Sequence, residues 1–180
     1  MPDGRDTAQA LVAATREFVP LAATWADGGK PAPAVRPVMA LHQVNYRQWQ
    51  SEDELRRPDL SDATLVRVRR RIERLNASRH ASIEALDEEL AAAIPMEPGA
   101  ELHSETPGMI ADRLSVLSIR LHFTRHAAFL LARPDLTARV PVVQEQIGDL
   151  RMALERLLDA CLAGRRRFKT YRELKLYEPG

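Results

Sequence analysis

The chain has 180 residues, of which 45% are hydrophobic and 28% charged, and its formal net charge is +1. This length suits one domain, and the balanced charge argues against a dedicated nucleic-acid binder, which usually carries a strong basic excess. No apolar run approaches the roughly 20 residues of a membrane-spanning helix. The charged N-terminus does not resemble a signal peptide, and Cys161 is the only cysteine, so we expect a cytoplasmic protein without disulfides.

The N-terminal part, residues 1–37, is predicted to hold a helix and a Pro/Gly-rich linker. The helix is expected over about 7–25, with an interruption near Pro20, and the linker over 27–37. Residues 38–180 are predicted to form the helical bundle itself. Because the sequence shows no internal repeat and no low-complexity tract, we expect one domain overall.

Four long helices are expected in the bundle, over about 38–55, 62–93, 107–132 and 137–163. Their ends carry recognisable signals: Ser61 or Asp62 and Thr106 are good N-caps, and Gly164 is a good helix stop. The terminal segment RRRFKTYRELKLY is predicted to add one more helical piece. The fold class is therefore an all-α, single-domain bundle of about five helices.

The helix at about 107–132 is apolar on nearly every side, which places it at the centre of the bundle. It starts with Pro107 and Gly108, and the missing side chain of Gly108 would leave the free amides of the first turn open to a ligand. A helix start of this kind is a potential anion site.

Polar residues occupy the predicted inward face of the helix at 38–55. At 100° per residue, one third of the circumference holds His42, Asn45, Tyr46, Trp49, Glu52, Asp53 and Arg56. The opposite, solvated face is predicted to hold Gln43, Arg47, Gln50, Ser51 and Glu54. On the next helix, Asn76 and Arg79 lie within the apolar stripe. A buried Arg needs acceptors, and Glu52 or Asp53 is its natural partner if the two helices pack antiparallel.

The segments HQVNYRQWQSEDELRR, RRIERLNASRHASIEALD, HSETPGMIADRLSVLSIRL and YRELKLY resemble a bacterial helical family known as domain of unknown function 4254. The resemblance covers roughly residues 38–177. This chain differs by Gln50 where a His is expected, and by Leu174 where an aromatic residue is usual. The resemblance implies carbohydrate or secondary-metabolite chemistry, and it implies the polar set His42, Asn45, Trp49, Glu52, Asp53, Asn76, Arg79, Glu84, Asp87, Glu105, Asp112 and Arg113.

Two interpretations of this polar set stay open: a structural ion-pair network, in which Arg79 and Arg113 pair with Asp53, Asp112 or Glu105, and a pocket between helices. In the second, His42 is the general acid or base, because its unperturbed pKa near 6.5 suits neutral pH. Glu52 or Asp53 would orient His42 or act as a second acid or base. The predicted substrate-binding residues are Asn45, Trp49, Asn76, Arg79, Glu105, Asp112 and Arg113, with the Arg residues holding an anionic group.

No dinucleotide fingerprint or phosphate-binding Gly loop is present, so we expect no organic cofactor. Glu84 and Asp87 resemble the second half of the Glu-xx-Glu…Glu-xx-Asp signature of Mg²⁺-dependent all-α nucleotide pyrophosphatases. The other half is missing, so Mg²⁺ stays a minor alternative and no metal ligands are assigned. The Arg clusters of the chain are balanced by nearby Asp and Glu, so nucleic acid is not an expected partner.

The sequence thus predicts a small-molecule enzyme of bacterial carbohydrate or secondary metabolism that binds an anionic metabolite or sugar nucleotide in an inter-helix pocket. Lyase, isomerase or transferase chemistry without an organic cofactor is expected. The alternative is a non-catalytic helical partner or scaffold subunit of a biosynthetic enzyme. The apolar stripe from Val143 to Cys161 would offer such a protein, or a homodimer, a packing face.

Overall fold

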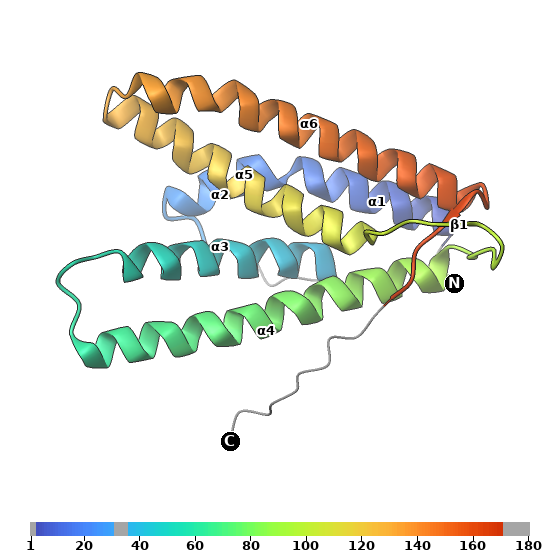
Figure 1. Ribbon diagram of the computed structural model, residues 1–180, viewed down its shortest axis with the longest axis horizontal. Helices are drawn as coiled ribbons and strands as arrows, with labels where there is room; N and C mark the ends of the chain where they lie inside the picture. Colours follow the sequence, from blue (N-terminus) through green and yellow to red (C-terminus); the bar gives the residue numbers. More distant parts are fainter. Residues whose placement is uncertain (1–2, 31–35, 171–180) are drawn as a thin grey trace.

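A computed structural model describes residues 3–30 and 36–170, and Figure 1 shows a bundle of long helices. The described residues form six helices and two very short strands. In chain order these are α1 (Gly4–Arg16), α2 (Phe18–Ala26), α3 (Pro37–Leu55), α4 (Asp62–Ala93), β1 (Glu101–Leu102), α5 (Pro107–Leu130), α6 (Pro134–Leu162) and β2 (Arg166–Arg167). The predicted all-α bundle is confirmed, with one helix more than expected.

The long helices begin where the capping residues predict. The Ser61 side chain accepts a hydrogen bond from the Thr64 amide, and the Thr106 side chain accepts one from the Met109 amide. Each bond satisfies one of the backbone donors that the first turn leaves unpaired. Proline begins α6 at Pro134, three residues before the predicted start, because the first helical position needs no N–H donor.

The N-terminal helix is interrupted at Glu17, earlier than the predicted break near Pro20. Pro20 lies in the first turn of α2, where its missing N–H breaks no helical hydrogen bond. The two short helices are part of the core. Leu11 of α1 is 3% exposed, and Phe18 of α2 is fully buried.

The central position of α5 is confirmed. It packs against α6, α3, α2, α4 and α1, and most of its first half is buried. Figure 1 shows two antiparallel pairs of helices, α3 with α4 and α5 with α6. The apolar stripe of α6 from Val143 to Cys161 belongs to the central hydrophobic core. The face that the sequence offered for a dimer is therefore used inside the chain.

The segment after α6 differs from the prediction of a further helical piece. Residues Arg166–Arg167 form β2, which pairs in parallel with β1, and residues 171–180 lie outside the described part of the chain. A hydrogen bond from the His103 amide to the Arg167 carbonyl extends this pairing by one residue. None of the described helices is long and apolar enough to cross a membrane.

Candidate functional site

Asp112 lies at the centre of a buried polar network between α3, α4 and α5. The residue is 5% exposed, and one of its carboxylate oxygens accepts hydrogen bonds from Asn45 Nδ2 at 2.9 Å and from Arg79 Nε at 2.8 Å. The other oxygen accepts a hydrogen bond from Arg79 Nη2. Arg79 is thus held in the bidentate geometry that fixes a guanidinium most firmly. Its bonds to Asp112 raise the pKa of Arg79 above the ordinary value.

The network continues inward from Asn45 to His42. Asn45 Nδ2 also donates to Ser115 Oγ at 3.0 Å, and Ser115 Oγ lies 2.8 Å from His42 Nδ1. His42 Nε2 lies 2.9 Å from the Phe18 carbonyl, which only accepts hydrogen bonds. Nε2 therefore carries the proton, and in the neutral ring Nδ1 accepts from the Ser115 hydroxyl.

His42 is fully buried and closely packed. Its ring stacks on Phe18 with centroids 4.3 Å apart, and Trp25 lies on it at 5.0 Å. Burial lowers the pKa of His42 to about 4, although the bond to the Phe18 carbonyl opposes the shift. The predicted catalytic histidine is thus neutral at pH 7, and both ring nitrogens are hydrogen-bonded inside the protein.

The predicted partners of Arg79 and His42 are corrected by the structure. Arg79 pairs with Asp112, one of the partners that the ion-pair interpretation named, whereas Asp53 lies at the surface with its Oδ1 3.6 Å from Arg56 Nη1. Glu52 is exposed and accepts a hydrogen bond from Gln48 at 2.9 Å, although its charge still acts on Arg79. Neither carboxylate orients His42. A helical wheel gives the direction of a side chain but not which element lies opposite it.

One part of the predicted solvated face of α3 is buried. Ser51 is 2% exposed and accepts a hydrogen bond from Arg71 Nε at 2.9 Å, and Glu54 pairs with the same guanidinium. Both contacts tie the last turns of α3 to α4. The prediction that Ser51 faces solvent was therefore wrong, whereas Glu54 is partly exposed.

The remaining predicted substrate-binding residues lie on three elements around the network. Arg113 Nη1 donates to both oxygens of Glu105, at 2.8 and 3.1 Å, near the surface. Asn76 is half-buried on α4, three residues before Arg79. Trp49 stacks on Phe123 with centroids 5.5 Å apart, within an aromatic cluster. Trp49 thus belongs to this aromatic cluster, whereas Arg113 directly follows Asp112 in α5.

An open cleft of about 430 Å³ lies beside the Arg79–Asp112 pair, between α4, α5 and α6. Its lining combines predicted residues with others that sequence reasoning missed: Arg79, Asp112, Arg113, Val116, Leu117, Gln146, Asp149 and Leu150. The polar side of α6 gave no signal, because Gln146 and Asp149 look like ordinary solvated residues. The buried network therefore ends at a solvent-accessible hollow.

The predicted anion site at the start of α5 is occupied by the chain itself. Asp87 of α4 is 3% exposed and accepts a hydrogen bond from the Gly108 amide at 2.7 Å and another from the Thr106 hydroxyl. A Cβ atom at Gly108 would lie 2.8 Å from Asp87 Oδ1. Gly108 thus admits a carboxylate from within the protein. Burial raises the pKa of Asp87 to about 6.

The described residues contain no group of three or more His, Cys, Asp or Glu side chains arranged for a metal ion. Asp87 of the Glu84-xx-Asp87 pair accepts a hydrogen bond from the Gly108 amide at the start of α5. Mg²⁺ binding therefore gains no support from these positions.

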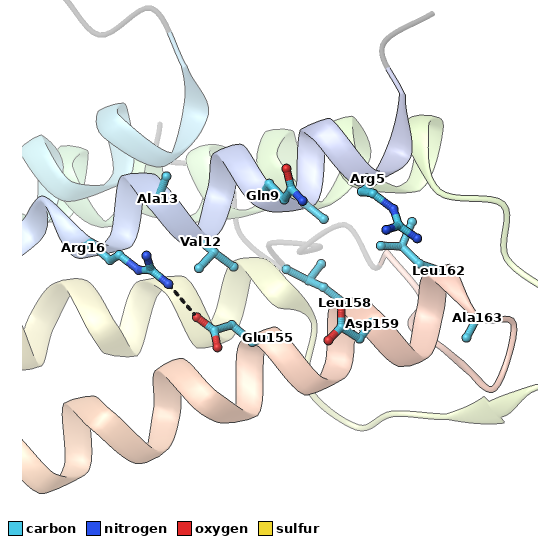
Figure 2. A pocket seen from close by; sticks show the side chains of 11 residues that line it. Arg5, Gln9, Val12, Ala13, Arg16, Glu155, Leu158, Asp159, Leu162 and Ala163 are labelled. Atoms are coloured by element: carbon cyan, nitrogen blue, oxygen red, sulfur yellow. Dashed lines mark hydrogen bonds and ion pairs between the residues drawn. The ribbon is translucent and has the colours of Figure 1, made fainter.

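A second hollow, a groove of about 510 Å³, lies between α1 and α6 (Figure 2). Arg5, Gln9 and Arg16 project from α1, and Glu155 and Asp159 from α6. Arg16 Nη2 lies 3.2 Å from Glu155 Oε1, so an ion pair crosses the groove. The sequence did not predict this groove, because the N-terminal helix was not expected to line a pocket with α6.

Comparison with known protein families identifies the family of this chain. Residues 36–170 match the family described as protein of unknown function (DUF4254), and the chain belongs to that family. No curated protein and no solved structure matches it. The match confirms the family resemblance and covers three of its four motifs, since YRELKLY at residues 171–177 lies beyond the matched range. It includes the whole Asp112 network except the α2 carbonyl, and it excludes α1, one wall of the groove in Figure 2.

Proposed function

We propose that this protein is a small-molecule enzyme that binds an anionic metabolite in the cleft between α4, α5 and α6. Arg79 and Arg113 would hold the anionic group, and Asp112 would act as the acid–base group. The observation that carries the proposal is the position of Asp112, a buried carboxylate that lines an open cleft while three elements fix its geometry. Hydrogen bonds that hold a functional side chain from its buried side are typical of sites in which that side chain needs a fixed orientation.

Both guanidinium groups keep donors for a ligand. Arg79 uses Nε and Nη2 on Asp112, which leaves Nη1 without a partner among the described residues, and Arg113 uses only Nη1 on Glu105. An incoming carboxylate or phosphate would compete with Asp112 for Arg79. Once Arg79 turns to the ligand, an oxygen of Asp112 becomes able to accept a proton from the bound molecule. Asn45 continues to hold Asp112 in place.

His42 takes a different role in this proposal from the one the sequence suggested. It is a positioning residue, because it lies two hydrogen bonds behind Asn45 and does not line the cleft. Its ring orders the Ser115 hydroxyl, which accepts from Asn45. Glu52 and Asp53 are not assigned to the chemistry, since both are exposed outside the cleft.

A thermal-shift screen tests the binding half of the proposal. The full chain is heated with small carboxylates, sugar phosphates and nucleotide sugars, because a ligand of the native state raises Tm by linkage. The variant Arg113→Gln removes an exposed cation of the cleft, and Arg156→Gln is the matched control on the exposed side of α6. A shift that Arg113→Gln abolishes and Arg156→Gln retains supports the proposal. A shift unaffected by Arg113→Gln moves the site elsewhere.

Turnover of any ligand found in this way tests the catalytic half. Asp112→Asn keeps the shape of the side chain and removes its basicity, so product formation should fall by about 100-fold or more while the ligand still binds. Full turnover by Asp112→Asn would contradict the acid–base role.

The alternative function, a non-catalytic partner subunit, is favoured by one feature. Phe129, Leu130 and Leu131 at the turn between α5 and α6 are 85%, 61% and 62% exposed, and exposed apolar patches often mark contact surfaces. Under this alternative, no metabolite raises Tm, and replacing Phe129 and Leu131 by Ser abolishes association with the partner subunit without lowering the Tm of the chain. Metabolite binding at Arg113 favours the enzyme.

A further inference from the structure

A third hollow has a different charge from the cleft and the groove. It encloses about 310 Å³ and is lined by three arginine residues, Arg16, Arg125 and Arg151, together with Val19, Leu121, Gln144, Ile147 and Gly148. None of these described lining residues is acidic. The side chains come from α1, α2, α5 and α6, so the fold brings together cations that are far apart in the sequence.

Arg151 provides the strongest sign of a missing ligand. Its Nε atom is buried and has no hydrogen-bond partner in the described structure. A buried donor of a charged group without an acceptor costs free energy, so such groups are rare in native proteins unless something binds them. Arg125 likewise has no ion-pair partner within the described residues.

The charge of the hollow indicates the class of ligand. Arg16 is paired with Glu155 across the neighbouring groove (Figure 2), whereas neither Arg125 nor Arg151 forms an ion pair with any residue that the structure describes. A phosphate monoester carries a charge of about −1.5 to −2 at pH 7 and offers three acceptor oxygens. Guanidinium groups match such oxygens in paired N–H···O bonds. A single carboxylate would neutralise only one of the two cations.

We propose that the hollow of Arg16, Arg125 and Arg151 is a binding site for the phosphoryl group of a small phosphorylated ligand. Gln144 supplies an amide donor at the same wall, and Leu121 and Ile147 provide an apolar surface for the remainder of the ligand. Gly148 leaves the space open, since nothing lies within 4 Å of a Cβ added there. This site is separate from the Asp112 cleft, and the two proposals stand independently.

Calorimetric titration of the full chain with inorganic phosphate and pyrophosphate tests the site. We expect Arg151→Gln and Arg125→Gln each to weaken binding about tenfold, the usual effect of losing one charge-assisted hydrogen bond. Arg125 is exposed, so its variant keeps the measurement valid if Arg151→Gln fails to fold. The control Arg156→Gln removes an equal charge from the exposed face of α6 and should bind as the unmodified chain does. Arg79→Gln distinguishes the two sites, because it removes a cation of the cleft and none of the hollow, so the phosphate binding that depends on Arg125 and Arg151 should persist.

Three results would overturn the proposal. One is the absence of binding by either anion. Another is equal weakening in Arg156→Gln, which would indicate general charge attraction. The third is loss of binding in Arg79→Gln with retention in Arg125→Gln, which would place the anion in the cleft and support the proposed function instead.

Discussion

Asn45 and Asp112 lie 67 positions apart in the chain, and the amide of the first donates to the carboxylate of the second at 2.9 Å. This bond joins α3 to α5, and Arg79 joins α4 to the same carboxylate. One buried acid therefore orders three helices and the wall of the cleft. Removing a partner from such a group leaves the others buried and unpaired, which is costly.

We expect Asp112→Ala to lower the free energy of unfolding by about 2–3 kcal/mol, below the usual cost of a broken buried pair because Arg79 is partly exposed and can regain water. Urea denaturation with circular dichroism measures this change. Asp53→Ala is the matched control, because Asp53 is an exposed carboxylate whose pairing with Arg56 contributes little. Equal stability loss in the two variants would contradict the account of Asp112.

Burial gives His42 a predictable effect on pH dependence. Its pKa is about 4 in the folded chain and about 6.5 when exposed, so between these values the unfolded state binds more protons. Stability from this group therefore rises with pH across that window and falls on acidification, by about 3 kcal/mol in all. Subtracting the unfolding free energies of His42→Gln from those of the unmodified chain at each pH should give this rising curve. A flat difference curve would contradict a neutral, buried His42.

Asp87 should act in the opposite direction. Its pKa is about 6 in the folded chain and about 3.8 when exposed, so the native state binds more protons between these values. Stability from this group is present below the lower value and is lost as pH rises toward 6. In Asp87→Asn, the unfolding free energy should therefore rise more steeply with pH than in the unmodified chain, because only the contribution of His42 remains. An unchanged slope would show that Asp87 titrates normally.

Gly108 is expected to tolerate no side chain. Its amide donates to Asp87, and an added Cβ would lie 2.8 Å from the carboxylate, so Gly108→Ala should destabilise the chain by about 1–3 kcal/mol. Gly148→Ala provides the contrast, because it adds a methyl group in open space within a helix and should stabilise by about 0.5–1 kcal/mol. Thermal unfolding of both variants measures the difference. Stabilisation by Gly108→Ala would contradict the close approach of Asp87.

Local signals in the sequence were sufficient for the helices but not for their contacts. The Ser61 and Thr106 caps and the apolar pattern of α5 indicate where helices start and which one is central. They do not decide whether Arg79 pairs with Asp112 of α5 or with Glu52 or Asp53 of α3, because local signals do not show which side chain lies opposite the guanidinium group. The Phe18 carbonyl that holds His42 has no side-chain signature. Asp87 was read as a half metal motif because the sequence does not show that it reaches the start of α5.

The central claim is that a ligand takes Arg79 from Asp112 in the cleft. Nitrogen-15 NMR of the arginine Nε–H groups measures this exchange directly during titration with the best ligand of the thermal-shift screen. We predict that the Arg79 Nε–H resonance, assigned by its absence in Arg79→Lys, shifts in proportion to ligand occupancy, while that of Arg156 stays in place. A saturating ligand that leaves the Arg79 resonance unmoved would contradict the claim.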